Sequence, residues 1–198
     1  SGGGHHWVVS LGVRLAPGWE GVVGKYLRRR RGFGLAERAI YRQVLSPREL
    51  PPVTLQLADA AATHAFGRQL AQRLSPGSTL LLQGDLGAGK TCLVQGLAAG
   101  LGITEPITSP TFALAQHYPL PRTGGLVHLD LYRLEQPAAA DELFAQEEEE
   151  ARALGALLAV EWPERLSALP EGCWRLHLSL SDPANPAAGR ELELIGPG

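Results

Sequence analysis

One glycine-rich stretch sets the class of fold, and it reads Gly84-Asp85-Leu86-Gly87-Ala88-Gly89-Lys90-Thr91. Every fixed position of the P-loop pattern G-x-x-x-x-G-K-[ST] is filled here. Residues 79–83 before it form a short, mostly apolar run, as expected of a buried parallel strand. The residues after it indicate a helix to about residues 97–99, which Gly100 or Gly102 ends. The order of strand, loop and helix predicts a nucleotide-binding α/β fold.

The residue types in this loop suit a triphosphate. Gly87 and Gly89 let backbone N–H groups approach closely spaced phosphates without a Cβ clash. A helix that starts near Lys90 adds its positive dipole end, Lys90 reaches the outer phosphates, and the Thr91 hydroxyl binds Mg²⁺. Arginine supplies sixteen of the eighteen basic residues, yet a lysine stands here. The alternative is a glycine-rich turn with a chance lysine, whereas binding of ATP or GTP accounts for every position.

Outside the loop, short apolar strands alternate with helices. Residues 53–57 alternate as a half-buried strand, and Asp59 is placed to cap a helix that extends to residue 74. An acidic helix is expected at residues 141–154, where the glutamates at 147–150 indicate a solvated face. Further strands are predicted at residues 113–118, 126–131, 157–160, 174–180 and 191–195. This pattern predicts an α/β P-loop NTPase with a mostly parallel central sheet, flanking helices and a C-terminal antiparallel hairpin.

The 198 residues divide by charge into two parts. Residues 1–50 hold nine basic and three acidic side chains, whereas residues 51–198 hold nine basic and seventeen acidic ones. Prolines at positions 51 and 52 mark the boundary. We therefore expect residues 1–50 to be a basic, poorly ordered or nonnative extension, and residues 51–198 to be the P-loop ATPase domain.

Cysteine content and hydropathy indicate the compartment. Two cysteines, Cys92 and Cys173, are too few for a disulfide framework or a four-ligand zinc module, and they fit a reducing cytosol. The apolar runs are too short and too interrupted for a transmembrane helix. The sequence therefore predicts a cytoplasmic protein with no membrane partner.

Phosphoryl transfer needs more than a P-loop, and acidic residues at strand ends are candidates for the rest. Asp130 ends one predicted strand, and Glu161 directly follows another, where a buried carboxylate needs a partner such as Mg²⁺. A strand-terminal aspartate that only caps a loop is the alternative for Asp130. The segment 108–112, which carries the hydroxyls of Thr108, Ser109 and Thr111, lies where a γ-phosphate sensor is expected, although it also suits an ordinary loop. Trp162 is equally suited to stack on a nucleotide or to cover the core.

Together these segments closely resemble the TsaE (formerly YjeE) family, the bacterial ATPases of tRNA threonylcarbamoyladenosine biosynthesis. The resemblance covers about residues 53–195, with matching stretches in the family's order at 84–91, 109–112, 128–134 and 161–163. It implies an Mg²⁺-dependent ATPase that works with the TsaD–TsaB heterodimer and meets tRNA through that complex. The modified base is the adenosine next to the anticodon in tRNAs reading codons that begin with A. The ATPase supports this chemistry but is not the threonylcarbamoyl transferase.

The resemblance also implies roles for single residues. Thr91 and Glu161 would ligate Mg²⁺, while Lys90, Thr111, Asp130 and Glu161 would serve hydrolysis. Cys92 stands where the family commonly has a second threonine, and its weaker thiol donor predicts somewhat weaker or slower turnover. The implied nucleotide contacts are Asp59, Gly84, Asp85, Leu86, Gly87, Ala88, Gly89, Lys90, Thr91, Cys92, Trp162 and Arg190.

Two other functions remain as alternatives. A small-molecule kinase shares the P-loop, but its lid is usually rich in arginine, and residues 51–198 show no arginine cluster after the loop. An independent nucleic-acid-binding module is the second alternative, because four consecutive arginines at 28–31 lie between Tyr26 and Phe33. A phosphate-release assay without an acceptor separates the first alternative from an ATPase, and tRNA binding with and without residues 1–50 tests the second.

Overall fold

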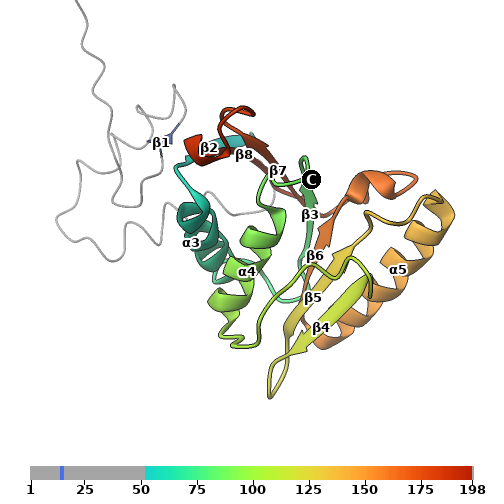
Figure 1. Cartoon of the computed structure of the whole chain (residues 1–198). Coiled ribbons are helices and arrows are strands. Elements are labelled where there is room, and N and C mark those ends of the chain that lie inside the picture. Colours follow the sequence, from blue (N-terminus) through green and yellow to red (C-terminus); the bar gives the residue numbers. More distant parts are fainter. Residues whose placement is uncertain (1–13, 16–51, 198) are drawn as a thin grey trace, which may run out of the picture.

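A computed structural model describes residues 14–15 and 52–197 of the chain (Figure 1). The predicted basic extension at residues 1–50 lies outside these residues, apart from a two-residue strand, and so does the boundary at Pro51. The described strands are β1 (Arg14–Leu15), β2 (Val53–Leu57), β3 (Thr79–Gln83), β4 (Ala115–Pro119), β5 (Gly125–Asp130), β6 (Leu157–Glu161), β7 (Trp174–Leu180) and β8 (Arg190–Ile195). The helices are α3 (Ala60–Ala71), α4 (Lys90–Leu101) and α5 (Pro137–Leu154), with 3₁₀ turns η1 (Pro163–Arg165) and η2 (Pro186–Ala188).

The strands form one mixed sheet in the order β1-β2-β8-β7-β3-β6-β5-β4. The four central strands β7, β3, β6 and β5 are parallel to one another. Outside them the pairing is antiparallel, between β4 and β5, between β7 and β8, and between β8 and β2. The predicted α/β P-loop fold is confirmed, as is the C-terminal antiparallel hairpin of β7 and β8. The connection from β4 to β5 is too short for a parallel crossover, so these two strands also pair antiparallel.

Helices cover both faces of the sheet, with α3 and α4 on one side and α5 on the other (Figure 1). Strand alternation explains this arrangement, because successive side chains point to opposite faces. Leu80 and Leu82 of β3 pack in the cluster that contains Leu93 and Leu97 of α4. Leu81, between them, joins the second cluster, which contains residues of α5. The P-loop strand is thus buried on both faces, which fixes the loop that follows it.

Helices α3 and α4 pack closely through glycines. A Cβ atom at Gly96 would overlap the carbonyl oxygen of His64, and one at Gly67 would overlap that of Leu93. Asp59 caps α3 as predicted, since its Oδ1 accepts a hydrogen bond from the Ala62 N–H at 2.7 Å. The glycine contacts pack α3 against α4, the helix that follows the phosphate loop.

The acidic helix differs from its prediction in two ways. It begins at Pro137 instead of residue 141, because proline is well suited to the first turn of a helix. Its glutamates are not all solvated: Glu147 is buried and lies 2.7 Å from His117 Nε2, and Glu148 Oε1 accepts a hydrogen bond from Thr79. The helical period turns some residues of this run toward the sheet. Within the described part of the chain, no helix is long and apolar enough to cross a membrane.

Candidate nucleotide site

The phosphate loop follows β3 and continues into the first turn of α4. Gly84 and Gly89 have φ angles of 135° and 109°, which favour glycine. A Cβ atom at Gly84 would also overlap the Leu178 carbonyl of β7. Gly89 is the N-cap of α4 and offers no side chain to the first N–H groups of the helix. The loop therefore presents backbone donors at a positive helix end, which is the usual geometry of a phosphate site.

Lys90 is held inside this loop. It is 4% exposed, and its Nζ donates to the carbonyl oxygens of Gly84 at 2.6 Å and Asp85 at 3.0 Å. The ammonium group also lies 4.1 Å from the ring centroid of Trp162. Burial lowers the pKa of Lys90, while Glu161 and other nearby carboxylates act in the opposite direction. The predicted phosphate ligand is therefore a fixed cation at the loop.

Thr91 and Glu161 meet directly. The Thr91 hydroxyl donates to Glu161 Oε1 at 2.9 Å, and the carboxylate is almost fully buried at the end of β6. Leu82 of β3 lies beside Glu161 in the parallel register, and this places the carboxylate next to the phosphate loop. A hydroxyl and a carboxylate are hard oxygen donors, so this pair fits Mg²⁺. The structure therefore brings together the two residues that the sequence predicted as metal ligands.

Asp130 lies one strand further along the same edge. Its register partner on β6 is Glu161, and it is 3% exposed. Its Oδ2 accepts from Ser109 Oγ at 2.6 Å and Thr111 Oγ1 at 3.2 Å, and its Oδ1 accepts from the Tyr132 N–H at 2.9 Å. The predicted sensor segment is thus tied to the predicted hydrolytic carboxylate through Thr111. Ser109 belongs to the same predicted segment, although no spacing rule distinguishes its hydroxyl from those of its neighbours.

Trp162 and Tyr132 form an aromatic pair beside Lys90. Trp162 has a φ of 61°, an unusual value for a bulky residue and a form of backbone strain often found at functional sites. Its ring centroid lies 4.8 Å from that of Tyr132, and the guanidinium of Arg165 lies 5.7 Å from the Tyr132 ring. Trp162 packs against the second core cluster as well as against the Lys90 ammonium, so it borders both the core and the loop.

The other predicted contact residues border the loop to different degrees. Arg190 Nε donates to the Ala88 carbonyl oxygen at 3.3 Å, so β8 reaches the phosphate loop. Cys92 Sγ points to the Ala60 carbonyl oxygen at 3.2 Å, and burial raises the pKa of its thiol, with Arg190 acting against that rise. The Asp59 carboxylate caps α3 by accepting a hydrogen bond from the Ala62 N–H. Among the loop's own residues, Ala88 is buried and Leu86 is 78% exposed.

Two features of this edge were missed from the sequence. His128 is fully buried, and its Nε2 lies 2.9 Å from Glu161 Oε1. The signal was available, because strand alternation places residue 128 on the same face as residue 130. Phe112 is 86% exposed and stacks with the Arg133 guanidinium at 4.3 Å. An exposed phenylalanine cannot be recognised from a single sequence, since burial depends on the tertiary contacts.

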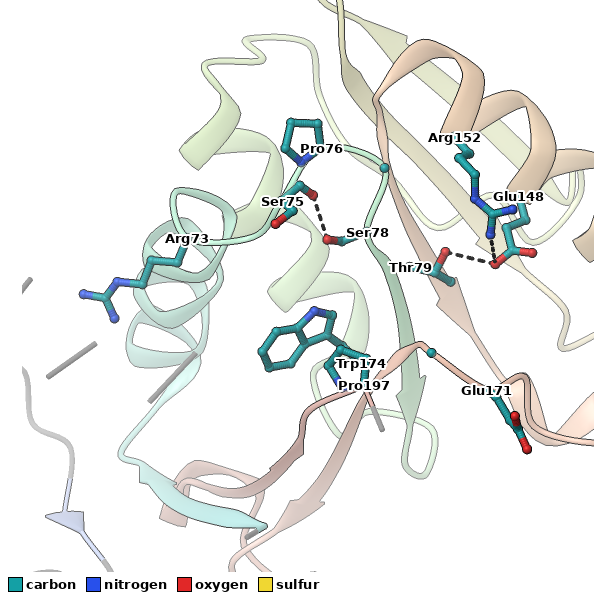
Figure 2. A pocket seen from close by; sticks show the side chains of 12 residues that line it. Arg73, Ser75, Pro76, Ser78, Thr79, Glu148, Arg152, Glu171, Trp174 and Pro197 are labelled. Carbon is teal, nitrogen blue, oxygen red and sulfur yellow. Dashed lines mark hydrogen bonds and ion pairs between the residues drawn. The ribbon is translucent and has the colours of Figure 1, made fainter. Parts of the chain in front are cut away.

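A separate hollow of about 400 Å³ lies at the opposite end of the sheet, where β3 and β7 begin (Figure 2). It contains none of the predicted site residues. Several of its polar side chains have partners within the protein. Thr79 Oγ1 donates to Glu148 Oε1 at 3.4 Å, Arg152 lies 3.2 Å from the same carboxylate, and Ser78 Oγ donates to the Ser75 backbone carbonyl oxygen at 2.6 Å. These polar groups make their hydrogen bonds within the protein. The candidate nucleotide site lies at the opposite end of the strands, where β3, β5 and β6 end.

Comparison with known proteins finds relatives for the part of the chain that contains this site. The family described as "Threonylcarbamoyl adenosine biosynthesis protein TsaE" matches residues 57–190. The tRNA threonylcarbamoyladenosine biosynthesis protein TsaE of Synechocystis is 52% identical over 118 residues, which cover 58% of this chain and 72% of that protein. The protein of the same name from Nostoc is 44% identical over 126 residues, or 64% of this chain and 77% of that protein. The crystal structure of Bacillus subtilis YdiB superposes with a TM-score of 0.56 at 28% identity, covering 76% of this chain and 89% of that one.

Proposed function

We propose that this chain, which belongs to the TsaE family of threonylcarbamoyl adenosine biosynthesis proteins, binds and hydrolyses ATP in support of tRNA threonylcarbamoyladenosine biosynthesis. The observation that carries the catalytic part is the register of β5 and β6. It sets Asp130 opposite Glu161 at the strand edge that carries the phosphate loop. A binding module would need the loop, but it would not need two buried carboxylates beside it.

Binding rests on the loop and on the start of α4. The free N–H groups at Gly89 and Lys90, together with the Lys90 ammonium, attract the phosphates. Arg190 holds the Ala88 carbonyl from the side of β8 and so keeps the loop in shape. Trp162 lies beside the Lys90 ammonium, and Trp162, Cys92 and Asp59 are the proposed outer contacts of the nucleotide. ATP is chosen over GTP because the chain is a TsaE protein.

Thr91 and Glu161 would hold Mg²⁺, which supplies charge neutralisation at the transferred phosphoryl group. The Thr91 hydroxyl and the Glu161 carboxylate are already 2.9 Å apart, so the donors are arranged in advance. Asp130 would orient the attacking water or accept its proton. Its bonds to Ser109 and Thr111 connect that carboxylate to a loop able to respond to the γ-phosphate.

The partners we propose are the TsaD and TsaB proteins, with tRNA reached through their complex. The acidic balance of residues 51–198 disfavours direct contact with an RNA backbone. Two large apolar side chains in the loops of the site, Leu86 and Phe112, are 78% and 86% exposed, which is typical of protein contact surfaces. Replacing Phe112, which is not among the implied nucleotide contacts, with serine should weaken association with TsaD–TsaB while leaving ATP affinity unchanged. We further propose a cytoplasmic setting, in which Cys92 and Cys173 remain the free thiols seen in the structure.

A phosphate-release assay tests the proposed activity. The chain is given ATP and Mg²⁺, first alone and then with TsaD and TsaB, and inorganic phosphate is measured. We expect release that depends on Mg²⁺ and requires no small-molecule acceptor. ATP consumption only in the presence of a phosphate-accepting metabolite would instead establish the kinase alternative, and binding of ATP without turnover under any of these conditions would refute the ATPase.

A further inference from the structure

His128 occupies an unusual position for a buried histidine. It lies on β5 with no exposed surface, and its Nε2 is 2.9 Å from Glu161 Oε1. Its other ring nitrogen, Nδ1, is buried and has no hydrogen-bond partner among the described residues. An apolar side chain here would avoid that unpaired atom, so packing alone does not account for the histidine.

The pairing determines which ring nitrogen carries hydrogen. An ionised carboxylate only accepts hydrogen bonds, so His128 Nε2 must be the donor. The neutral ring then keeps Nδ1 as a bare acceptor, which is easier to bury unpaired than a second N–H group. Thr91 Oγ1 donates to the same carboxylate oxygen at 2.9 Å. Among the described residues, both hydrogen bonds of the Glu161 side chain therefore fall on Oε1.

We propose that His128 is a positioning residue, which holds Glu161 by Oε1 and leaves Oε2 as the oxygen that would hold Mg²⁺. This inference rests on the proposed Mg²⁺-dependent function of the site. Two donors on one oxygen fix the rotation of the carboxylate group, which a single bond from Thr91 would leave free. Strand β5 supplies the second donor because His128 lies two residues before Asp130 and so shares its face of the sheet. On the neighbouring strand β6, their register partners are Ala159 and Glu161. One strand thus carries both the hydrolytic carboxylate and the support of the metal ligand.

A pair of substitutions separates positioning from packing. His128→Gln keeps an N–H donor near the place of Nε2, whereas His128→Leu keeps the bulk and removes the donor. Outer-shell partners of metal ligands typically change metal affinity or activity by about 10–100-fold. We expect His128→Leu to raise the Mg²⁺ concentration needed for half-maximal binding of a nonhydrolysable ATP analogue by roughly 10-fold. His128→Gln should remain near the wild type, and so should the control His177→Leu, which alters an exposed histidine on β7.

Nitrogen-15 NMR of the nucleotide-free protein gives a readout independent of activity. Wild-type His128 should show a hydrogen on Nε2, and Glu161→Ala should shift that signal by removing its acceptor. A ring that carries hydrogen on Nδ1 and none on Nε2 would overturn the proposal, and so would wild-type Mg²⁺ dependence in a folded His128→Leu protein. Failure of the wild type itself to bind the Mg²⁺–nucleotide complex would instead refute the proposed function, and the NMR result would still show whether His128 holds Glu161.

Discussion

Replacement of Asp130 separates its structural role from its catalytic one. The carboxylate accepts three hydrogen bonds, from Ser109, Thr111 and the Tyr132 N–H. In Asp130→Asn, the amide oxygen can keep the Tyr132 bond while the amide nitrogen donates to a hydroxyl, since hydroxyls also accept. In Asp130→Ala all three bonds are lost, although Ser109 is exposed and can turn to water.

The magnitudes follow from these bonds. Hydrogen bonds to a charged group contribute about 1.5–3 kcal/mol each and neutral ones about 1 kcal/mol. Asp130→Asn should therefore lower the free energy of unfolding by about 1–2 kcal/mol, and Asp130→Ala by about 2–4 kcal/mol once water has replaced some partners. Both proteins lose the charge that activates water, so hydrolysis should fall by on the order of 10²-fold in each.

Urea unfolding and phosphate release measured on the same protein samples check this reasoning. The expected result is a graded loss of stability and an equal loss of hydrolysis. If Asp130→Asn retains wild-type hydrolysis, the charge of Asp130 has no catalytic role. If the asparagine protein is as unstable as the alanine protein, the amide does not preserve the loop as argued.

Three more predictions concern the loop, the helix pair and the buried thiol. Lys90→Ala should reduce hydrolysis by on the order of 10²–10³-fold. Lys90→Arg should not restore hydrolysis, because the planar guanidinium does not fit a site where Nζ meets two carbonyl oxygens. Recovery of hydrolysis in the arginine protein would contradict this reasoning. Gly96→Ala should destabilise by about 1–3 kcal/mol in urea unfolding, because its Cβ meets the His64 carbonyl oxygen, and an unchanged midpoint would contradict the close packing of α3 on α4. Burial raises the pKa of Cys173 from 9.0 to about 11, so the folded chain keeps this proton where the unfolded chain loses it. Stability should therefore decrease as the pH rises from 9 to 11, and Cys173→Ala should reduce that slope in unfolding measurements, a result that equal slopes would refute.

Much of the site follows from local sequence, because its chemistry depends on fixed spacing. Glycines at 84 and 89 with Lys90 and Thr91 define the loop by backbone geometry, which a single sequence reveals. Asp130 and Glu161 were identified as acidic residues at the ends of apolar strands. Their placement as register partners could not be predicted. Strands β5 and β6 are separated in the sequence by helix α5, and the register in which they pair depends on tertiary contacts.

The misses have physical causes of the same kind. Glu147 belongs to a run of four glutamates that suggested a solvated face, but its partner His117 lies thirty positions away on β4. The strand predicted at residue 113 begins at Ala115, because Leu114 takes a φ of 65° and closes the loop before it. The side-chain network of Ser109 and Asp130 likewise depends on contacts between distant segments. Contacts between such distant residues cannot be predicted from the local sequence pattern or from secondary-structure propensity.

Reconstitution of tRNA threonylcarbamoylation tests the central claim most directly. Purified TsaD and TsaB, a tRNA substrate and the threonylcarbamoyl donor are combined with the wild-type chain, with Lys90→Ala, or with neither, and modified tRNA is counted per TsaD–TsaB complex. We predict repeated turnover only with the wild-type chain and ATP. Equal turnover with Lys90→Ala, or with the chain omitted, would contradict a role for this P-loop site in the modification.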